Sequence, residues 1–112
     1  MKAITIKTLK TNIHPQTKAL FYFLFVGSRG GDNRIRIMST LRENPSNANQ
    51  IAAIVSIDYK SVQHHIKVLE KNNMVSRIGG KYGATYFVSA LFEEGQDAFD
   101  EILSKLQKSI GT

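Results

Sequence analysis

Two of the chain's three histidines, His64 and His65, are adjacent in the segment from Ser61 to Leu69. Imidazole can bind a metal ion, transfer a proton or contact an acidic partner, so three kinds of chemistry are open here. The nearest carboxylates in the sequence belong to Asp58 and Glu70, and neighbouring residues of a helix point about 100° apart. The pair therefore makes a poor metal set, and we expect no metal site.

Catalysis and thiolate chemistry lack the residues that they need. The sequence has no cysteine, which excludes disulfides and cysteine metal ligands and is typical of an intracellular protein. It also has no Gly-x-Ser-x-Gly, His-Glu-x-x-His or phosphate-loop motif, so the common hydrolytic and nucleotide-binding sites are missing. We expect a protein that is not an enzyme and that uses no cofactor.

The formal charge of +6 is unevenly distributed along the 112 residues. Residues 1–92 hold 13 Lys and Arg against 4 Asp and Glu, whereas residues 93–112 hold 2 against 5. A basic body favours a polyanionic partner, and nucleic acid is the first candidate. The longest apolar run, from Ala19 to Val26, has eight residues, and a helix needs about 20 to span a membrane. We expect no membrane segment and a cytoplasmic location.

The spacing of apolar and turn-forming residues predicts helices followed by one β-hairpin. The predicted elements are, in order, a strand or extended arm over residues 2–10, a helix over 16–26, a helix capped by Asp32, a shorter helix capped by Ser46 or Asn47, a helix over 58–72, strands over 74–78 and 84–88, and a last helix over 89–110.

The helix over 58–72 has two unlike faces. Its apolar residues recur at steps of three and four, so they should form the core face; they are Tyr59, Val62, Ile66 and Leu69. The opposite face carries Lys60, His64, Lys67 and Lys71. On a helical wheel His65 lies at the edge of the apolar face, so the two histidines are predicted to do different jobs.

The last helix carries an apolar stripe that three helices and a hairpin do not obviously cover. The N-terminal helix and a second subunit are the expected acceptors, so we expect a homodimer. The aromatic run from Phe21 to Phe25 is interpreted as core or dimer interface rather than a ligand pocket. The expected interface comprises Phe21, Phe25, Phe92, Phe99, Leu103, Leu106 and Ile110.

Three separated patterns fall in register with a known family. The segment Asn33-Arg-Ile-Arg-Ile-Met-Ser-Thr-Leu41 resembles the opening helix of the ArsR-like winged-helix repressors. Residues 51–57, the segment from Ser61 to Leu69 and Asn72-Asn-Met-Val75 resemble their helix-turn-helix, including its His-Ile-x-x-Leu core. The likeness covers about residues 30–89, and the residues at 29–31, 47–50 and 58–60 are most similar to archaeal members.

The resemblance also has a departure that bears on metals. Metal-sensing members carry a cysteine pair just before and within the second helix, where this chain has Asn47 and Asn49. The other metal site of such families needs histidines on the last helix, and residues 90–112 contain none. The resemblance therefore implies a regulator without a soft-metal site, and the effector is unidentified.

The resemblance implies a mainly α fold with a small β-hairpin, a winged helix-turn-helix. It divides the chain into an N-terminal dimerisation segment (1–30), a DNA-binding domain (31–89) and a C-terminal dimerisation helix (90–112). The implied function is a homodimeric transcription regulator that binds double-stranded DNA, with the helix over 58–72 in the major groove. A winged helix that serves only protein assembly is the alternative, because fold alone does not fix function.

Within this frame each polar residue has an expected role. Gln63 and His64 should read base edges, whereas Lys60 and Lys67 should meet phosphates. His65 is expected to pack or to contact a phosphate. The remaining expected DNA contacts are Ser61 on the same helix, Arg77, Lys81 and Tyr82 in the hairpin, and Arg34 and Arg36 on the first helix of the domain.

Overall fold

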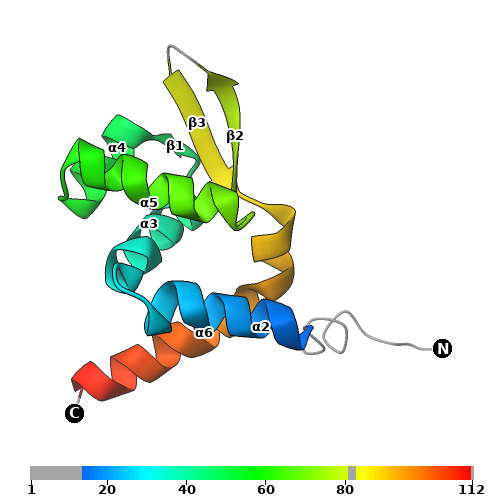
Figure 1. The fold of residues 1–112 in the computed structure, drawn as a ribbon. Helices are drawn as coiled ribbons and strands as arrows, with labels where there is room; N and C mark the ends of the chain where they lie inside the picture. Colours follow the sequence, from blue (N-terminus) through cyan, green and yellow to red (C-terminus); the bar gives the residue numbers. More distant parts are fainter. Residues whose placement is uncertain (1–13, 81–82, 112) are drawn as a thin grey trace.

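The computed structural model describes residues 14–80 and 83–111, with side chains up to Lys108. The arm predicted over residues 2–10 lies outside the described residues. The chain forms helix α2 (Pro15–Tyr22), its π-helical continuation η1 (Phe23–Gly27), helix α3 (Gly31–Glu43), strand β1 (Ser46–Asn47), helices α4 (Ala48–Val55) and α5 (Tyr59–Lys71), strands β2 (Val75–Gly80) and β3 (Gly83–Val88), and helix α6 (Ala90–Gly111) (Figure 1).

The predicted fold class is confirmed. Helices α3, α4 and α5 are followed by a β2–β3 hairpin, as in a winged helix-turn-helix. β1 adds a short third strand, so the antiparallel sheet has the order β1-β3-β2. Ser46 lies opposite Tyr86 in β3. The sequence did not predict β1, because a strand of two residues is too short to show alternation.

Capping side chains and left-handed residues mark where the helices of this core begin and end. Asn47 caps α4 through a capping box with Gln50, and Asp58 caps α5 by accepting a hydrogen bond from the Ser61 amide. After α5, Asn73 adopts a left-handed φ of 61°. The amide of Met74 then donates to the carbonyl of Leu69, which completes a Schellman end. One predicted cap is wrong: Gly30 occupies the N-cap of α3, and Asp32 lies within its first turn.

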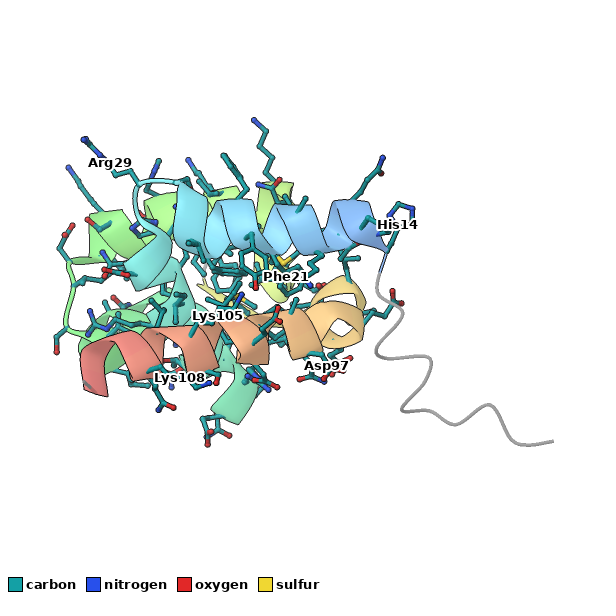
Figure 2. The ribbon with its side chains drawn as sticks, turned by 90° about the horizontal axis from the view of Figure 1, so that it is seen from below. His14, Phe21, Arg29, Asp97, Lys105 and Lys108 are labelled. Atoms are coloured by element: carbon teal, nitrogen blue, oxygen red, sulfur yellow. The ribbon has the colours of Figure 1, made fainter. Side chains whose placement is uncertain are left out.

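Helices α2 and α6 lie side by side at the end of the molecule remote from the hairpin (Figure 1). Phe21 points from α2 towards α6 (Figure 2). Its ring stacks on Phe92 with centroids 5.6 Å apart, and the ring of Phe25 meets Phe99 at 5.1 Å. Because Phe21 pairs with Phe92 and Phe25 with Phe99, the two helices run in the same direction.

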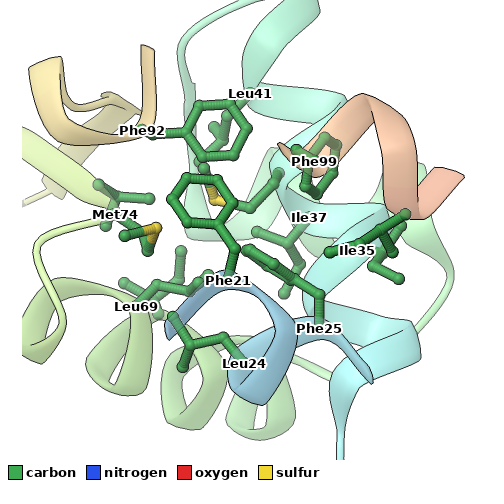
Figure 3. Packing of buried hydrophobic residues seen from close by; sticks show 14 of the residues in the cluster. Phe21, Leu24, Phe25, Ile35, Ile37, Leu41, Leu69, Met74, Phe92 and Phe99 are labelled. Carbon is green, nitrogen blue, oxygen red and sulfur yellow. The ribbon is translucent and has the colours of Figure 1, made fainter. Parts of the chain in front are cut away.

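The hydrophobic cluster continues from these aromatic rings into the helix-turn-helix. Phe21 contacts the same cluster as Leu69 of α5 and Met74 before β2 (Figure 3). Residues from all three predicted segments (1–30, 31–89 and 90–112) therefore share one core. The assignment of dimerisation to residues 1–30 and 90–112, and of DNA binding to residues 31–89, stays a prediction.

The predicted dimer interface needs correction in four of its residues. Phe21, Phe25, Phe92 and Phe99 are buried inside a single chain, so their side chains cannot also face a second subunit. The sequence left both the N-terminal helix and a second subunit open as partners of the stripe on α6, and in the structure α2 and η1 of the same chain cover Phe92 and Phe99. Leu103 and Leu106 are half-buried, and the side chain of Ile110 lies outside the described part.

Some apolar side chains remain exposed on the outer side of the N-terminal segment. Phe23 is 58% exposed and Val26 is 54% exposed. Both residues belong to η1. Phe21, Leu24 and Phe25 of the same N-terminal segment are buried. The N-terminal segment thus packs inward on one face and leaves an apolar face uncovered.

Candidate nucleic-acid interface

Helix α5 presents a row of polar residues because its other face is anchored in the core. Val62, Ile66 and Leu69 are buried. The exposed residues on the opposite side of the helix include Lys60, Gln63, His64 and Lys67, as its spacing predicts. Cations and hydrogen-bonding groups thus lie together on one helix face, where they can meet phosphates and base edges.

The start of α5 is held by its cap. The carboxylate of Asp58 accepts hydrogen bonds from the Ser61 amide at 3.0 Å and from the Ser61 hydroxyl at 2.7 Å. These two bonds hold the pKa of Asp58 below its ordinary value. The hydroxyl proton of Ser61 is therefore engaged within the cap. Ser61 can still accept a hydrogen bond, but its first role in this structure is to fix the helix start.

The turn between α4 and α5 is fixed by its backbone and by α3. Ser56 ends α4 in the left-handed conformation, with φ of 59°, and its amide donates to the carbonyl of Ala52. The guanidinium of Arg36, which reaches across from α3, donates to the carbonyl of Val55 and to Asn33 Oδ1. Arg36 is exposed, so it braces the turn while remaining open to a phosphate.

The expected phosphate contact of Arg34 is wrong. Arg34 is only 4% exposed. Its guanidinium donates to the carbonyls of Leu24 and Arg29 and to the hydroxyl of Ser28. It therefore ties the end of the N-terminal segment to α3, and its Nε and Nη2 groups donate to protein acceptors rather than to phosphate. The spacing of the helix could have separated Arg34 from Arg36, because Arg34 lies four positions before Met38, on the side of the buried residues.

His65 packs against Arg34 and is 8% exposed. Its Nδ1 lies 3.4 Å from a guanidinium nitrogen of Arg34. Burial, the Arg34 cation and the neighbouring His64 lower the pKa of His65 below 6.5. Of the two roles expected for His65, packing therefore holds, and its ring does not reach the exposed face. A side chain at Gly30 would collide with both groups, since an added Cβ would lie 2.7 Å from the His65 ring.

The β2–β3 hairpin is the wing of this fold. A polar hollow of about 320 Å³ lies between the wing and the first half of α5. Tyr59 and Gln63 line it from α5, Arg77 and Tyr86 from the hairpin, and Asn47 from the start of α4. Arg77 is half-exposed and forms an ion pair with Glu70 of α5 at 3.4 Å. It therefore links the wing to α5 while one side of its guanidinium remains open. Lys81 and Tyr82 lie outside the described residues.

The sequence misplaced Tyr59. It was predicted in the core stripe of α5, yet it is 44% exposed. Its hydroxyl accepts a hydrogen bond from Gln63 Nε2 at 3.1 Å. As the first residue of α5, Tyr59 lies beyond the packed stripe, which begins at Val62. The spacing of four residues between Tyr59 and Gln63, which places them on one helix face, is the signal that could have indicated this pair.

Within residues 14–80 and 83–108, the histidine, aspartate and glutamate side chains form no group of three that could hold a metal ion. Among the helices described, none combines the length and apolar character that crossing a membrane requires.

Comparison with known proteins agrees with the winged-helix geometry. HlyU from Vibrio cholerae has a TM-score of 0.59 at 16% identity, over 81% of this chain and 92% of that one. Rv0081 from M. tuberculosis has a TM-score of 0.60 at 17% identity, over 89% and 100%. The transcriptional regulator Tm0710 from Thermotoga maritima has a TM-score of 0.55 at 11% identity, over 87% and 74%.

At the level of sequence, residues 31–77 match the family model described as "Bacterial regulatory protein, arsR family". The search of curated proteins found no match. The matched segment begins with α3 and ends within β2, so it contains the whole helix-turn-helix. Residues 31–77 therefore form a helix-turn-helix similar to that of the ArsR family, within a winged-helix fold that is shared with solved transcriptional regulators.

Proposed function

We propose that this protein is a transcription regulator that binds a specific sequence of double-stranded DNA as a homodimer. Helix α5 lies in the major groove, and the wing lies on the adjacent backbone or in the minor groove. The observation that carries the proposal is the exposed row Lys60, Gln63, His64 and Lys67 on a helix whose opposite face is fixed in the core.

The charges of the surrounding surface support the same orientation. Arg36 and Arg77 flank α5 and keep exposed guanidinium groups beside it. Five of the chain's nine acidic residues lie in residues 93–112, on α6 at the other end of the molecule (Figure 1). A duplex that approaches α5 therefore meets the basic end first.

Self-association is the second part of the proposal. Two copies would place two α5 helices on half-sites about one helical turn apart. The uncovered apolar face of the N-terminal segment, with Phe23 and Val26, is the contact that we propose, and half-buried Leu103 and Leu106 on α6 can add to it. Phe23→Ser should reduce the mass measured by light scattering at micromolar concentration; a wild-type chain that is already monomeric would contradict dimerisation.

Two further features belong to the proposal. The motifs at residues 29–31, 47–50 and 58–60 support an archaeal type of regulator, and a DNA-binding role places the protein in the cytoplasm. We propose no catalytic role and no cofactor. The chain's three histidines and complete lack of cysteine give no support to a thiolate metal sensor.

A gel shift on the DNA upstream of the protein's own coding sequence tests the function. The Lys60→Ala and His64→Ala variants should bind less tightly than the wild type. Lys108→Ala is the matched control, because it removes a cation from α6 at the opposite end of the molecule (Figure 2). If all three variants shift this DNA as the wild type does, the row on α5 is not the DNA-binding surface, and a protein-assembly role becomes the better explanation.

A further inference from the structure

A hydrogen bond connects Gln63, a member of the exposed row in α5, to the side chain of Tyr59 at the start of that helix. It joins Gln63 Nε2 to the Tyr59 hydroxyl over 3.1 Å. Both residues line the hollow under the wing. Lys60, His64 and Lys67 make no side-chain hydrogen bond to the described part of the chain. Gln63 is therefore the member of this row whose orientation is set before any partner arrives.

The consequence for recognition depends on which groups of the amide remain open. The Nε2 group has two hydrogens, and Tyr59 takes one of them. When Tyr59 takes the hydrogen that points away from Oε1, the second hydrogen and Oε1 stay free beside each other. This pair matches the N7 acceptor and N6 donor that adenine shows in the major groove. Guanine shows two acceptors there, so its O6 would face Oε1 without a hydrogen between them.

The hydrogen bond to Tyr59 also reduces the conformational freedom of the Gln63 side chain. Glutamine has several rotatable bonds and loses considerable rotamer entropy when it is fixed. Tyr59 has a rigid ring at the start of α5, next to the Asp58 cap that holds the first turn. A bond from that ring to Gln63 selects amide rotamers in the free protein, so less ordering is left for binding.

We propose that Tyr59 is a positioning residue that aims the amide of Gln63 at an adenine of the DNA site. The proposal rests on the proposed function and adds to it a specific base and a residue that was not expected to take part. Tyr59 acts through Gln63, and its hydroxyl is not itself the group that reads the base.

The test begins with selection of duplexes from a random library by the wild-type protein. Fluorescence anisotropy at fixed salt then compares the selected duplex with versions in which each A·T pair is changed to G·C. We expect Gln63→Ala to lose the preference at one position per half-site by about tenfold or more. Tyr59→Phe should lose part of the preference, several-fold, at that same position and keep the others.

The double variant separates a positioning role from a direct contact. If Tyr59 acts through Gln63, adding Tyr59→Phe to Gln63→Ala changes nothing further. Tyr86→Phe is the matched control, because it removes a hydroxyl from the other wall of the hollow, and it should keep every preference. A merely structural role would instead weaken all duplexes equally and lower the thermal midpoint of unfolding.

Three results would overturn the inference alone: a Tyr59→Phe variant that keeps the full preference, a Gln63→Ala variant that keeps it, or an additive effect in the double variant. A wild-type protein that enriches no sequence at all would overturn the proposed function, and the inference with it. The two failures are therefore distinguished by the first step of the experiment.

Discussion

Two pairs of like residues, two arginines and two histidines, show that residues of one type and close in sequence have different environments in this protein. Arg34 is enclosed between the N-terminal segment and α5, whereas Arg36 is exposed at the turn of the helix-turn-helix. His65 is enclosed with Arg34, whereas His64 is exposed. Residues two apart in a helix point to nearly opposite sides, and adjacent residues diverge by about 100°. The residue type alone therefore does not assign a contact with DNA.

Removing the Arg34 side chain should destabilise the fold. The Arg34→Met variant would leave the carbonyls of Leu24 and Arg29 and the hydroxyl of Ser28 without their donor. We expect the free energy of unfolding to fall by about 2 to 3 kcal/mol, measured by urea denaturation. Arg29→Met removes an exposed guanidinium and should change stability by less than about 0.5 kcal/mol. Equal losses in the two variants would contradict this role for Arg34.

Stability should decrease on mild acidification because His65 is buried beside a cation. Its pKa in the folded chain is below the unfolded value of 6.5. Above pH ~7 both states hold a neutral imidazole, and below it the unfolded chain gains a proton that the folded chain excludes. This group therefore lowers the free energy of unfolding as pH falls from about 6.5 towards the folded pKa.

Urea denaturation between about pH 7 and about pH 5 measures this dependence, since most carboxylates titrate below that window. The His65→Gln variant, which cannot titrate, should show a weaker loss of stability than the wild type. His64→Gln removes the exposed imidazole and should keep most of the loss. A wild type whose stability is flat over this range would contradict the buried, neutral state of His65.

At the scale of elements, the ends of α4 and α5 were predicted, whereas the N-cap of α3 and the short or irregular elements were not. The caps at Asn47 and Asp58 and the stop at Asn72–Asn73 depend on side chains that bond to nearby backbone, so the local sequence contains the signal. The π-helix η1 and the two-residue β1 depend on contacts with α3 and β3. Those contacts join residues that are far apart in sequence.

The capping box of α4 should contribute measurably to stability. Asn47 accepts a bond from the Gln50 amide, and the Gln50 side chain accepts one from the Asn47 amide, both at 2.8 Å. Asn47→Ala should lower the free energy of unfolding by about 1 kcal/mol. Asn49→Ala, inside the same helix and exposed, should cost less than about 0.5 kcal/mol. Circular dichroism during urea unfolding compares the two, and a reversed order would contradict the cap.

At the scale of the whole molecule, the order of layers could not be obtained from the sequence. Periodicity identified the apolar stripe on α6 and left the N-terminal helix and a second subunit as its expected partners, but it did not show which residues of the stripe α2 covers. Whether Phe21 or Phe23 faces inward depends on the angle at which α2 crosses α6, which is a property of the packed fold. Periodicity predicted which face of α5 is exposed, whereas Arg34 and Tyr59 were misplaced.

Phe21 and Phe23 give a direct test of this layering. Phe21→Ala removes a ring from the centre of the core (Figure 3) and should lower the free energy of unfolding by about 3 to 5 kcal/mol. Phe23→Ala removes an exposed ring and should cost less than about 1 kcal/mol at a concentration where the chain is monomeric. Thermal and urea unfolding of both variants measure the difference; similar losses would contradict the assignment of inner and outer faces.

We propose that the basic end of the molecule binds DNA by displacing counterions from its phosphates while α5 reads the bases. If a dimer makes six to ten phosphate contacts, raising the salt from ~50 to ~200 mM should weaken its affinity for the selected duplex by roughly a thousandfold or more. Combining Lys60→Ala with Lys67→Ala should lower the slope of log affinity against log salt by roughly one for each phosphate contact removed. A salt titration that is flat for the wild type, or a slope that these substitutions leave unchanged, would contradict the account.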